Sequence, residues 1–208
     1  MKHEQKISIS KGNRKLGLVM NVSMTPGRSC PRGVPCAGQG CYALKALRLY
    51  PGTRAAWRRN ELIAKHHPDS YFTQIAAQVA KAKPRLFRFH VAGDILNIGY
   101  LACMCRVAAA NPHTHFLAFS KAFDVVNEYE DREVIPSNLV IVFSAWPGMT
   151  FLNPHGHRVA WMQDGTETRV PGDAIECPGN CETCGMCYEL ERLGHDVVFH
   201  IDSAIRPT

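Results

Sequence analysis

Two groups of cysteines carry the chemistry that this sequence is best suited to perform. The first group, Cys30, Cys36 and Cys41, lies in a segment rich in glycine and proline, with gaps of five and four residues. The second group has four members within eleven residues, namely Cys177, Cys181, Cys184 and Cys187. Because neighbouring thiolates repel one another unless a cation neutralises them, both groups are typical of soft-metal sites.

The spacing of the cysteines favours iron over zinc. A structural zinc site usually has two cysteine pairs separated by a longer loop, and neither group has that pattern. The short gaps of the second group are closer to the runs that hold iron–sulfur clusters, so we expect a 4Fe-4S cluster, with zinc as the alternative at these late cysteines. Since the first group has three thiols, its cluster would have either an open iron that binds a substrate or a fourth ligand from the second group. The protein would then hold one cluster or two.

Polar side chains follow three of the predicted strands. Asp94 comes after the first, Ser120 and Lys121 after the second, and Ser144 after the third. In parallel α/β folds the working site lies beyond the carboxyl ends of the strands, so these residues predict a shared cleft. We take Asp94 and Lys121 as candidate catalytic residues, and Ser120 and Ser144 as candidate cofactor-binding residues. The alternative is that these polar residues only cap or turn the segments that follow.

The first of these strands also carries charge. Arg88 and His90 are expected on one face of the strand, with Phe87 and Phe89 on the other. A central strand of a parallel sheet is usually apolar on both faces, and an inward-facing charge needs a ligand or a counter-ion. Arg88 and His90 therefore join the candidate catalytic residues. The alternative is that they lie on the solvent-exposed face of an edge strand.

The elements that must position these residues alternate regularly in the middle of the chain. We expect strands at 86–91, 115–119 and 139–143, separated by helices at 95–110 and 121–129. Strands that alternate with helices through short links predict parallel strands with right-handed crossovers. The fold class is therefore α/β, with a partial (β/α) barrel-like parallel sheet.

The flanking regions complete a single domain of three segments. Residues 1–84 hold the cysteine loop and basic helices, 85–165 the βαβαβ core, and 166–208 the cysteine-rich segment and a last strand. Besides the three strands and two helices named above, we expect strands at 7–10, 18–22, 159–162 and 197–201, and helices at 43–49, 53–66 and 68–83. The first cysteine group would then lie at the end of a strand, directly before a helix.

Composition limits the compartment and the partners. The nine cysteines are an odd number in tight groups, and no apolar run is long enough for a signal peptide or membrane span, so we expect a cytoplasmic protein without a membrane partner. Residues 1–65 carry 13 Lys or Arg against 2 Asp or Glu, whereas 66–208 carry 11 against 16. The basic first third is the expected surface for an anionic small molecule or nucleic acid.

Several motifs together resemble the phage gene-product-88 family. They are the run 11–17 (KGNRKLG), the loop ending Cys41-Tyr42-Ala43, the segment 88–94 (RFHVAGD), the strand end Phe119-Ser120-Lys121 and the late cysteine cluster. These motifs span most of the chain. The resemblance implies a phage-encoded cysteine-cluster protein that works in the bacterial cytoplasm.

The cysteine loop is also similar, more weakly, to that of radical SAM-like phage proteins, in which Tyr-Ala follows the third cysteine. This resemblance implies that Cys30, Cys36 and Cys41 bind a cluster with an open iron, and that S-adenosylmethionine is a cofactor. The gaps of five and four residues depart from the usual radical SAM gaps of three and two.

Three functions fit these observations. The first is a redox or radical-type enzyme, an iron–sulfur oxidoreductase or a radical SAM-like enzyme, with a 4Fe-4S cluster at the mouth of a polar cleft. The second is an iron–sulfur electron carrier or sensor that works with an electron-transfer partner and needs no cleft. The third is a zinc-stabilised nucleic-acid-binding protein, in which Arg54, Arg58 and Arg59 around Trp57 contact phosphates.

Overall fold

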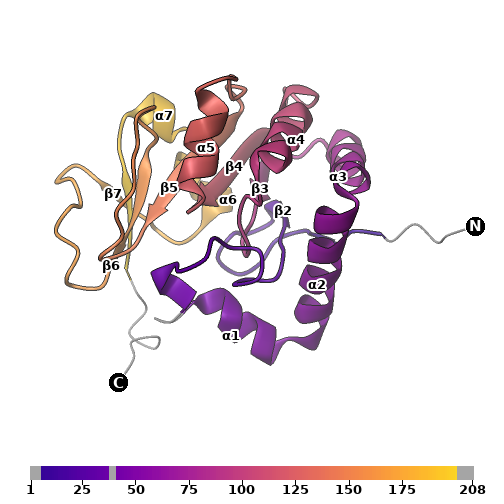
Figure 1. The fold of residues 1–208 in the computed structure, drawn as a ribbon, viewed down its shortest axis with the longest axis horizontal. Helices are drawn as coiled ribbons and strands as arrows, with labels where there is room; N and C mark the ends of the chain where they lie inside the picture. Colours follow the sequence, from indigo (N-terminus) through magenta and orange to yellow (C-terminus); the bar gives the residue numbers. More distant parts are fainter. Residues whose placement is uncertain (1–5, 38–40, 201–208) are drawn as a thin grey trace, which may run out of the picture.

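The chain folds around one sheet of eight strands, mostly parallel, in a computed structural model that describes residues 6–37 and 41–200. The strand order is β1-β2-β3-β4-β5-β6-β8-β7, and among these described strands only β1 runs antiparallel to its neighbour. The strands are β1 (Ile9–Ser10), β2 (Met20–Val22), β3 (Leu86–Phe89), β4 (His115–Ser120), β5 (Leu139–Ala145), β6 (Val159–Gln163), β7 (Ile175–Glu176) and β8 (Val197–His200). The predicted α/β class with a largely parallel sheet is confirmed (Figure 1).

Seven α-helices accompany the sheet in the part of the chain that the structure describes. They are α1 (Tyr42–Leu49), α2 (Pro51–His66), α3 (Pro68–Ala82), α4 (Ile98–Ala109), α5 (Phe123–Glu130), α6 (Cys181–Cys184) and α7 (Leu190–Leu193). Pro51 and Pro68 are the first residues of α2 and α3. An N–H at this position has no acceptor within the helix, so the missing N–H of proline costs no hydrogen bond. At α4 the Asn97 side chain accepts the Tyr100 N–H at 2.9 Å, so the helix begins at 98 instead of the predicted 95.

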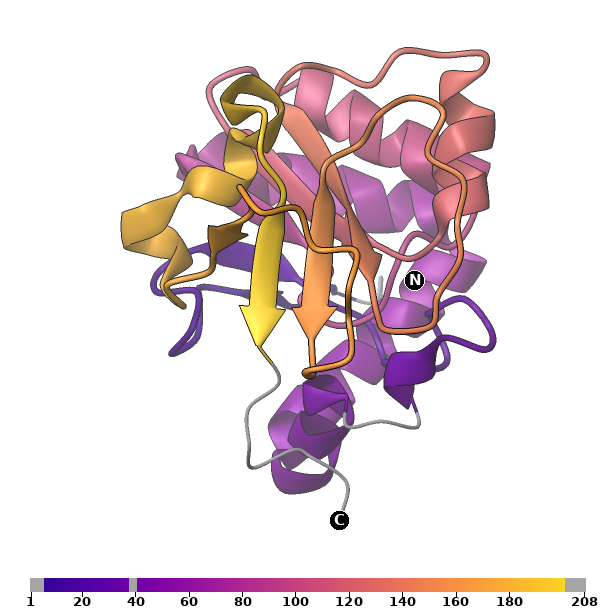
Figure 2. The ribbon, with the colours of Figure 1, turned by 90° about the vertical axis from the view of Figure 1, so that its left-hand side faces the viewer.

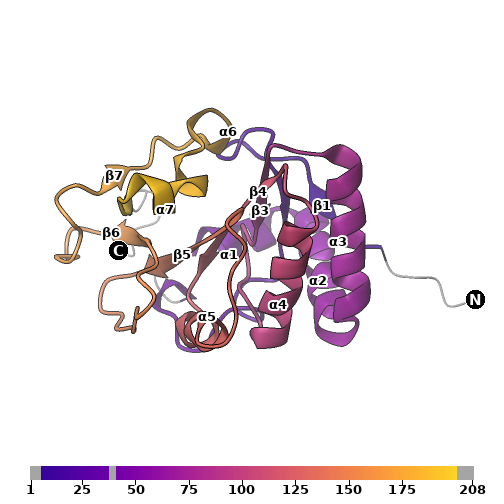
Figure 3. The ribbon, with the colours of Figure 1, turned by 90° about the horizontal axis from the view of Figure 1, so that it is seen from above.

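The sheet separates two apolar layers. Helices α2 to α5 cover one face, where side chains such as Phe87, Phe116 and Ile141 are buried. The opposite face, lined by Leu86, Leu117 and Val140 among others, is covered by the C-terminal segment around α6 and α7 (Figure 3). The predicted strands match those observed within a few residues, except that Ile201, the predicted end of the last one, lies outside the described residues.

The predicted alternation of faces along the strand at 86–91 is wrong beyond Phe89. His90 adopts the left-handed backbone conformation, with φ of 57°, and its Nε2 lies 2.9 Å from the Tyr100 hydroxyl of α4. His90 is therefore buried on the helix-covered side, away from Arg88, while Val91 packs with the opposite layer. The turn ends the strand, and the period-2 pattern ends with it.

The C-terminal segment is anchored to the turn that joins β1 and β2. The N–H groups of Cys181 and Glu182 donate to the carbonyls of Lys15 and Leu16, at 3.3 and 3.0 Å. A Cβ on Gly17 would lie 2.5 Å from that of Glu182, so only glycine permits this close approach. Among the described residues, no helix is long and apolar enough to cross a membrane.

Candidate metal centres and the adjoining cleft

The first cysteine group lies at the carboxyl ends of the parallel strands. In Figure 2 the arrows of β6 and β8 point toward the side on which the cysteine loop and α1 lie. The loop is held there by backbone bonds that extend the β2–β3 pairing, with Met24 N–H donating to the Ala92 carbonyl at 2.9 Å. Ser29 packs directly on Gly93, where an added Cβ would lie 2.6 Å from the Ser29 Oγ and the backbone has φ of 89°.

The three thiols of this group are electrostatic neighbours. Burial raises the pKa of Cys30, while the Gly27 N–H, 3.4 Å from its sulfur, and Lys121 act in the opposite direction. A hydrogen bond from the Cys36 thiol to the Cys41 sulfur lowers the pKa of Cys41 and raises that of Cys36. Lys121 favours the thiolate form of all three cysteines. The group therefore fits an anionic metal–thiolate centre with a cation beside it.

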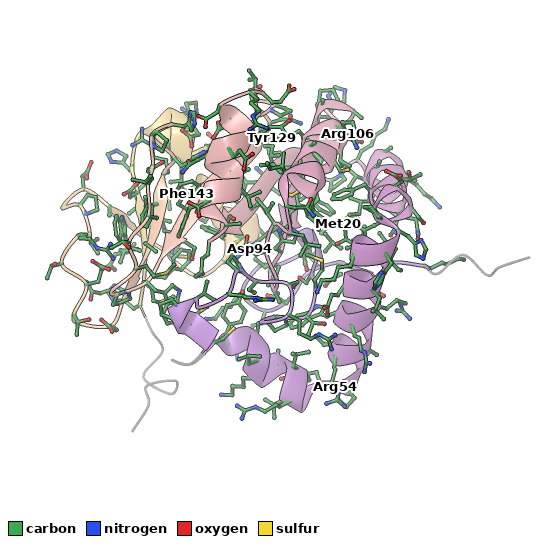
Figure 4. The ribbon with its side chains drawn as sticks, viewed as in Figure 1. Met20, Arg54, Asp94, Arg106, Tyr129 and Phe143 are labelled. Carbon is green, nitrogen blue, oxygen red and sulfur yellow. The ribbon has the colours of Figure 1, made fainter. Side chains whose placement is uncertain are left out.

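Three strand ends are tied together by hydrogen bonds at this edge of the sheet. Asp94 accepts the Ser120 hydroxyl at 2.7 Å and the Lys121 backbone N–H at 2.8 Å, while the Lys121 ammonium donates to the Ser144 Oγ at 2.8 Å. Asp94 also accepts the N–H of Ile95 at 2.7 Å, so it caps the following turn as well. The structure brings these four polar residues together, and Figure 4 shows Asp94 near the centre of the molecule.

The carboxylate of Asp94 is buried and accepts three hydrogen bonds. Both of its oxygens accept hydrogen bonds and its residue is only 4 % exposed. Burial raises its pKa, while the bonds from Ser120 and Lys121 lower it. This geometry suits a residue that positions Lys121.

A cleft of about 820 Å³ opens beside the first cysteine group. Cys30, Arg28 and Lys121 line it from the loop and the strand ends, and the N-terminal turns of α4 and α5 form its opposite side. Lys65 and Arg106 also line it, although Lys65 is paired with the buried Glu61 at 2.7 Å. Of the residues expected to line the cleft, only Lys121 does so, because Arg88, His90 and Asp94 are turned elsewhere.

The second cysteine group forms a separate site on the other face of the sheet. All four of its thiols line one hollow, which is closed below by Tyr188 and Leu190. Arg88 of β3 lies beside this hollow, with its guanidinium carbon 4.7 Å from the centre of the Phe119 ring. Burial raises the pKa of Cys181 and of Cys187, and the Arg88 charge lowers both. The structure therefore separates the two cysteine groups instead of joining them around one cluster.

All seven cysteines of the two groups have free thiols, each partly exposed. Within residues 6–37 and 41–200, no three His, Cys, Asp or Glu side chains are arranged to hold a single metal ion. The case for metal therefore rests on the clustering of thiols and on the groups around them. Cys103 and Cys105 are buried in α4, as expected of core residues.

Several residues of these sites had no signal in the sequence. Arg28, Lys65 and Arg106 come from three distant segments, and only the folded chain places them on one cleft. Tyr188 follows the last cysteine, and its role as the floor of the second hollow depends on how the segment docks on β4 and β5. Asn97 could have been found, since an asparagine before a helical pattern is a typical N-cap.

The chain matches the protein-family model Gene product 88 over residues 2–182. The chain belongs to this family. The match supports the expected phage origin, and it covers the first cysteine group together with Cys177 and Cys181.

No curated protein and no solved structure matches the chain. The resemblance to radical SAM-like phage proteins therefore has no support from the comparisons. The binding of S-adenosylmethionine, which that resemblance implied, stays a prediction.

Proposed function

We propose that this Gene product 88 protein is an iron–sulfur enzyme of redox type, with a 4Fe-4S cluster on Cys30, Cys36 and Cys41. The observation that carries the proposal is that Cys30 and Lys121 line the same cleft of about 820 Å³. A thiol group of three leaves one iron of such a cluster without a protein ligand, next to space for a small molecule. When bound, the cluster would supply the electron for a reaction in the cleft.

The surrounding residues have defined tasks in this proposal. Lys121 offsets the negative charge of the thiolates and contributes positive charge to the cleft, with its ammonium held by Ser144 at 2.8 Å. Asp94 fixes the Lys121 backbone and the Ser120 hydroxyl, and so sets the position of both strand ends. Basic side chains outnumber acidic ones around the cleft, which favours an anionic small molecule as the substrate.

The cleft is also what favours an enzyme over an electron carrier. A carrier needs only a cluster near the surface, and gains nothing from a large opening beside one of its ligands. Small-molecule sites typically have volumes of about 300–1,000 Å³, and this cleft lies in that range. An anionic substrate that reaches Lys121 would therefore also lie beside the Cys30 sulfur.

Anaerobic reconstitution with iron and sulfide tests the proposal. We expect a brown protein whose reduced form gives an electron paramagnetic resonance (EPR) signal, and we expect cyanide, a small anionic ligand for open iron, to shift that signal. Replacing Lys121 with methionine should weaken the cyanide effect, because the positive charge in the cleft is lost. Arg54→Met is the matched control, since Arg54 is an exposed arginine of α2 outside the cleft.

Two outcomes would contradict the proposal. A protein that stays colourless after reconstitution would show that it holds no iron–sulfur cluster. A cluster whose signal responds to no added ligand would instead favour the electron carrier.

A further inference from the structure

Arg88 carries a charge for which the described residues offer no carboxylate. None of the ion pairs found among them involves Arg88, and its Nε is buried without a hydrogen-bond partner. Its guanidinium instead lies over the Phe119 ring and beside the sulfur of Cys181. A half-buried cation in such a place is unfavourable unless an anion lies close to it.

Tyr188 presents the same problem at the hollow itself. Its side chain lines the hollow with the four cysteines, the residue is 4 % exposed, and its hydroxyl has no hydrogen-bond partner among the residues that the structure describes. Buried polar groups normally find partners, so two unpaired donors at one small site point to acceptors that the polypeptide does not supply.

The chemistry of the two candidate metals differs at this point. A zinc ion bound by four cysteines offers only thiolate sulfurs as acceptors. An iron–sulfur cluster adds bridging sulfides, which accept hydrogen bonds from groups around the site. Both centres are anionic, but only the cluster adds acceptors for Arg88 and Tyr188 beyond the four ligand sulfurs.

We propose that the hollow formed by Cys177, Cys181, Cys184 and Cys187 holds a second iron–sulfur cluster, closed by four thiolates, for which Arg88 is the counter-ion and a hydrogen-bond donor. Arg88 acts here as a positioning residue that sets the reduction potential, and not as a catalytic residue of the cleft. This inference goes beyond the proposed function, because it concerns a different set of ligands on the opposite face of the sheet.

The test isolates the second centre by replacing Cys30, Cys36 and Cys41 with serine in the full chain. After anaerobic reconstitution with iron, sulfide and zinc all present, we expect iron and acid-labile sulfide in equal amounts and no zinc. The inference is overturned if this variant binds zinc without sulfide, or binds no metal. Either result leaves the proposed function intact, because that function is judged on the first group in the wild-type chain.

A redox titration followed by EPR then tests the part played by Arg88. In the same triple-serine background, Arg88→Gln should shift the midpoint potential to a more negative value, because removing a nearby positive charge disfavours the reduced form. Arg54→Gln is the control, since Arg54 is an exposed arginine of α2 that lines neither the hollow nor the cleft. Its midpoint potential should equal that of the parent.

Tyr188→Phe keeps the test decisive if the Arg88 variant does not fold. It removes one unpaired hydroxyl from a buried ring, and so has little reason to disturb the packing. We expect a shift in the same direction, because a hydrogen bond to the cluster is lost. A midpoint potential unchanged in every Arg88 or Tyr188 variant that folds would overturn the assigned role.

Discussion

His90 is expected to make the protein less stable as the solution becomes acidic. Burial, with a smaller effect from the Arg88 charge, lowers the pKa of His90 to about 3 from its usual 6.5. Between these two values the unfolded chain binds a proton at this site and the folded protein does not. Stability is therefore fully present above about pH 6.5 and is lost as the pH falls below it.

The size of the effect follows from the displacement of the pKa. Between the two pKa values, each pH unit lowers the free energy of unfolding by up to about 1.4 kcal/mol. Lowering the pH from about 7.5 to about 5 should therefore lower the free energy of unfolding by about 2 kcal/mol. Tyr100 of α4 contacts the His90 ring, and Tyr71 of α3 contacts Tyr100 in turn. Arg88 of β3, on the other face of the sheet, acts on His90 through its charge. None of them is a carboxylate that would stabilise a charged imidazole.

Native-state hydrogen exchange of the slowest amides in β3 and β4 measures the free energy of unfolding under conditions in which the protein stays folded. The variant is His90→Asn, because asparagine tolerates the positive φ of this position and does not titrate. Its overall stability will be lower, but its pH dependence should be smaller than that of the wild type by about 2 kcal/mol over the same range. The same change at the exposed His66 should leave the wild-type dependence in place. Equal pH dependence in His90→Asn and the wild type would refute the reasoning.

Two further predictions concern the edge of the sheet that carries the cleft. Gly93→Ala should unfold at a lower temperature and retain less iron than the wild type. The left-handed backbone at this position disfavours a side chain by about 1–2 kcal/mol, and the new Cβ would also meet Ser29. Gly99→Ala is the control: its new Cβ would have no neighbour closer than 3.4 Å, so it should behave like the wild type in both measurements. Asp94→Asn should lower the free energy of unfolding in denaturant by about 1–3 kcal/mol, because an amide nitrogen cannot accept the bond from Ser120 or from the Lys121 N–H. Unchanged stability would show that these bonds do not hold the strand ends.

The strands and the meeting of polar residues at their ends could be predicted because both follow from local pattern. Apolar runs separated by helical periods indicate parallel strands, and parallel strands bring their carboxyl ends to one edge. Asp94, Ser120, Lys121 and Ser144 meet there for that reason. The cysteine loop joins them because β2 lies next to β3 in the same sheet.

The parts that could not be predicted depend on backbone conformation or on distant contacts. Nothing in the sequence marks His90 as left-handed, so its side chain was placed on the wrong face. The separation of the two cysteine groups depends on the docking of Glu182 against Leu16 and Gly17, which lie more than 160 residues earlier in the chain. The proximity of Arg88 to Cys181 and Cys187 depends on the same docking, so it could not be predicted from the sequence either.

The central claim is that the first cysteine group holds iron and sulfide beside the cleft. The most direct measurement is the EPR spectrum of reduced protein purified without exposure to oxygen, compared between the wild type and the triple-serine variant at Cys30, Cys36 and Cys41. We predict a cluster signal in the wild type that the variant lacks and that cyanide shifts. Identical spectra from the two proteins, or zinc as the sole metal bound by the first group, would contradict this account.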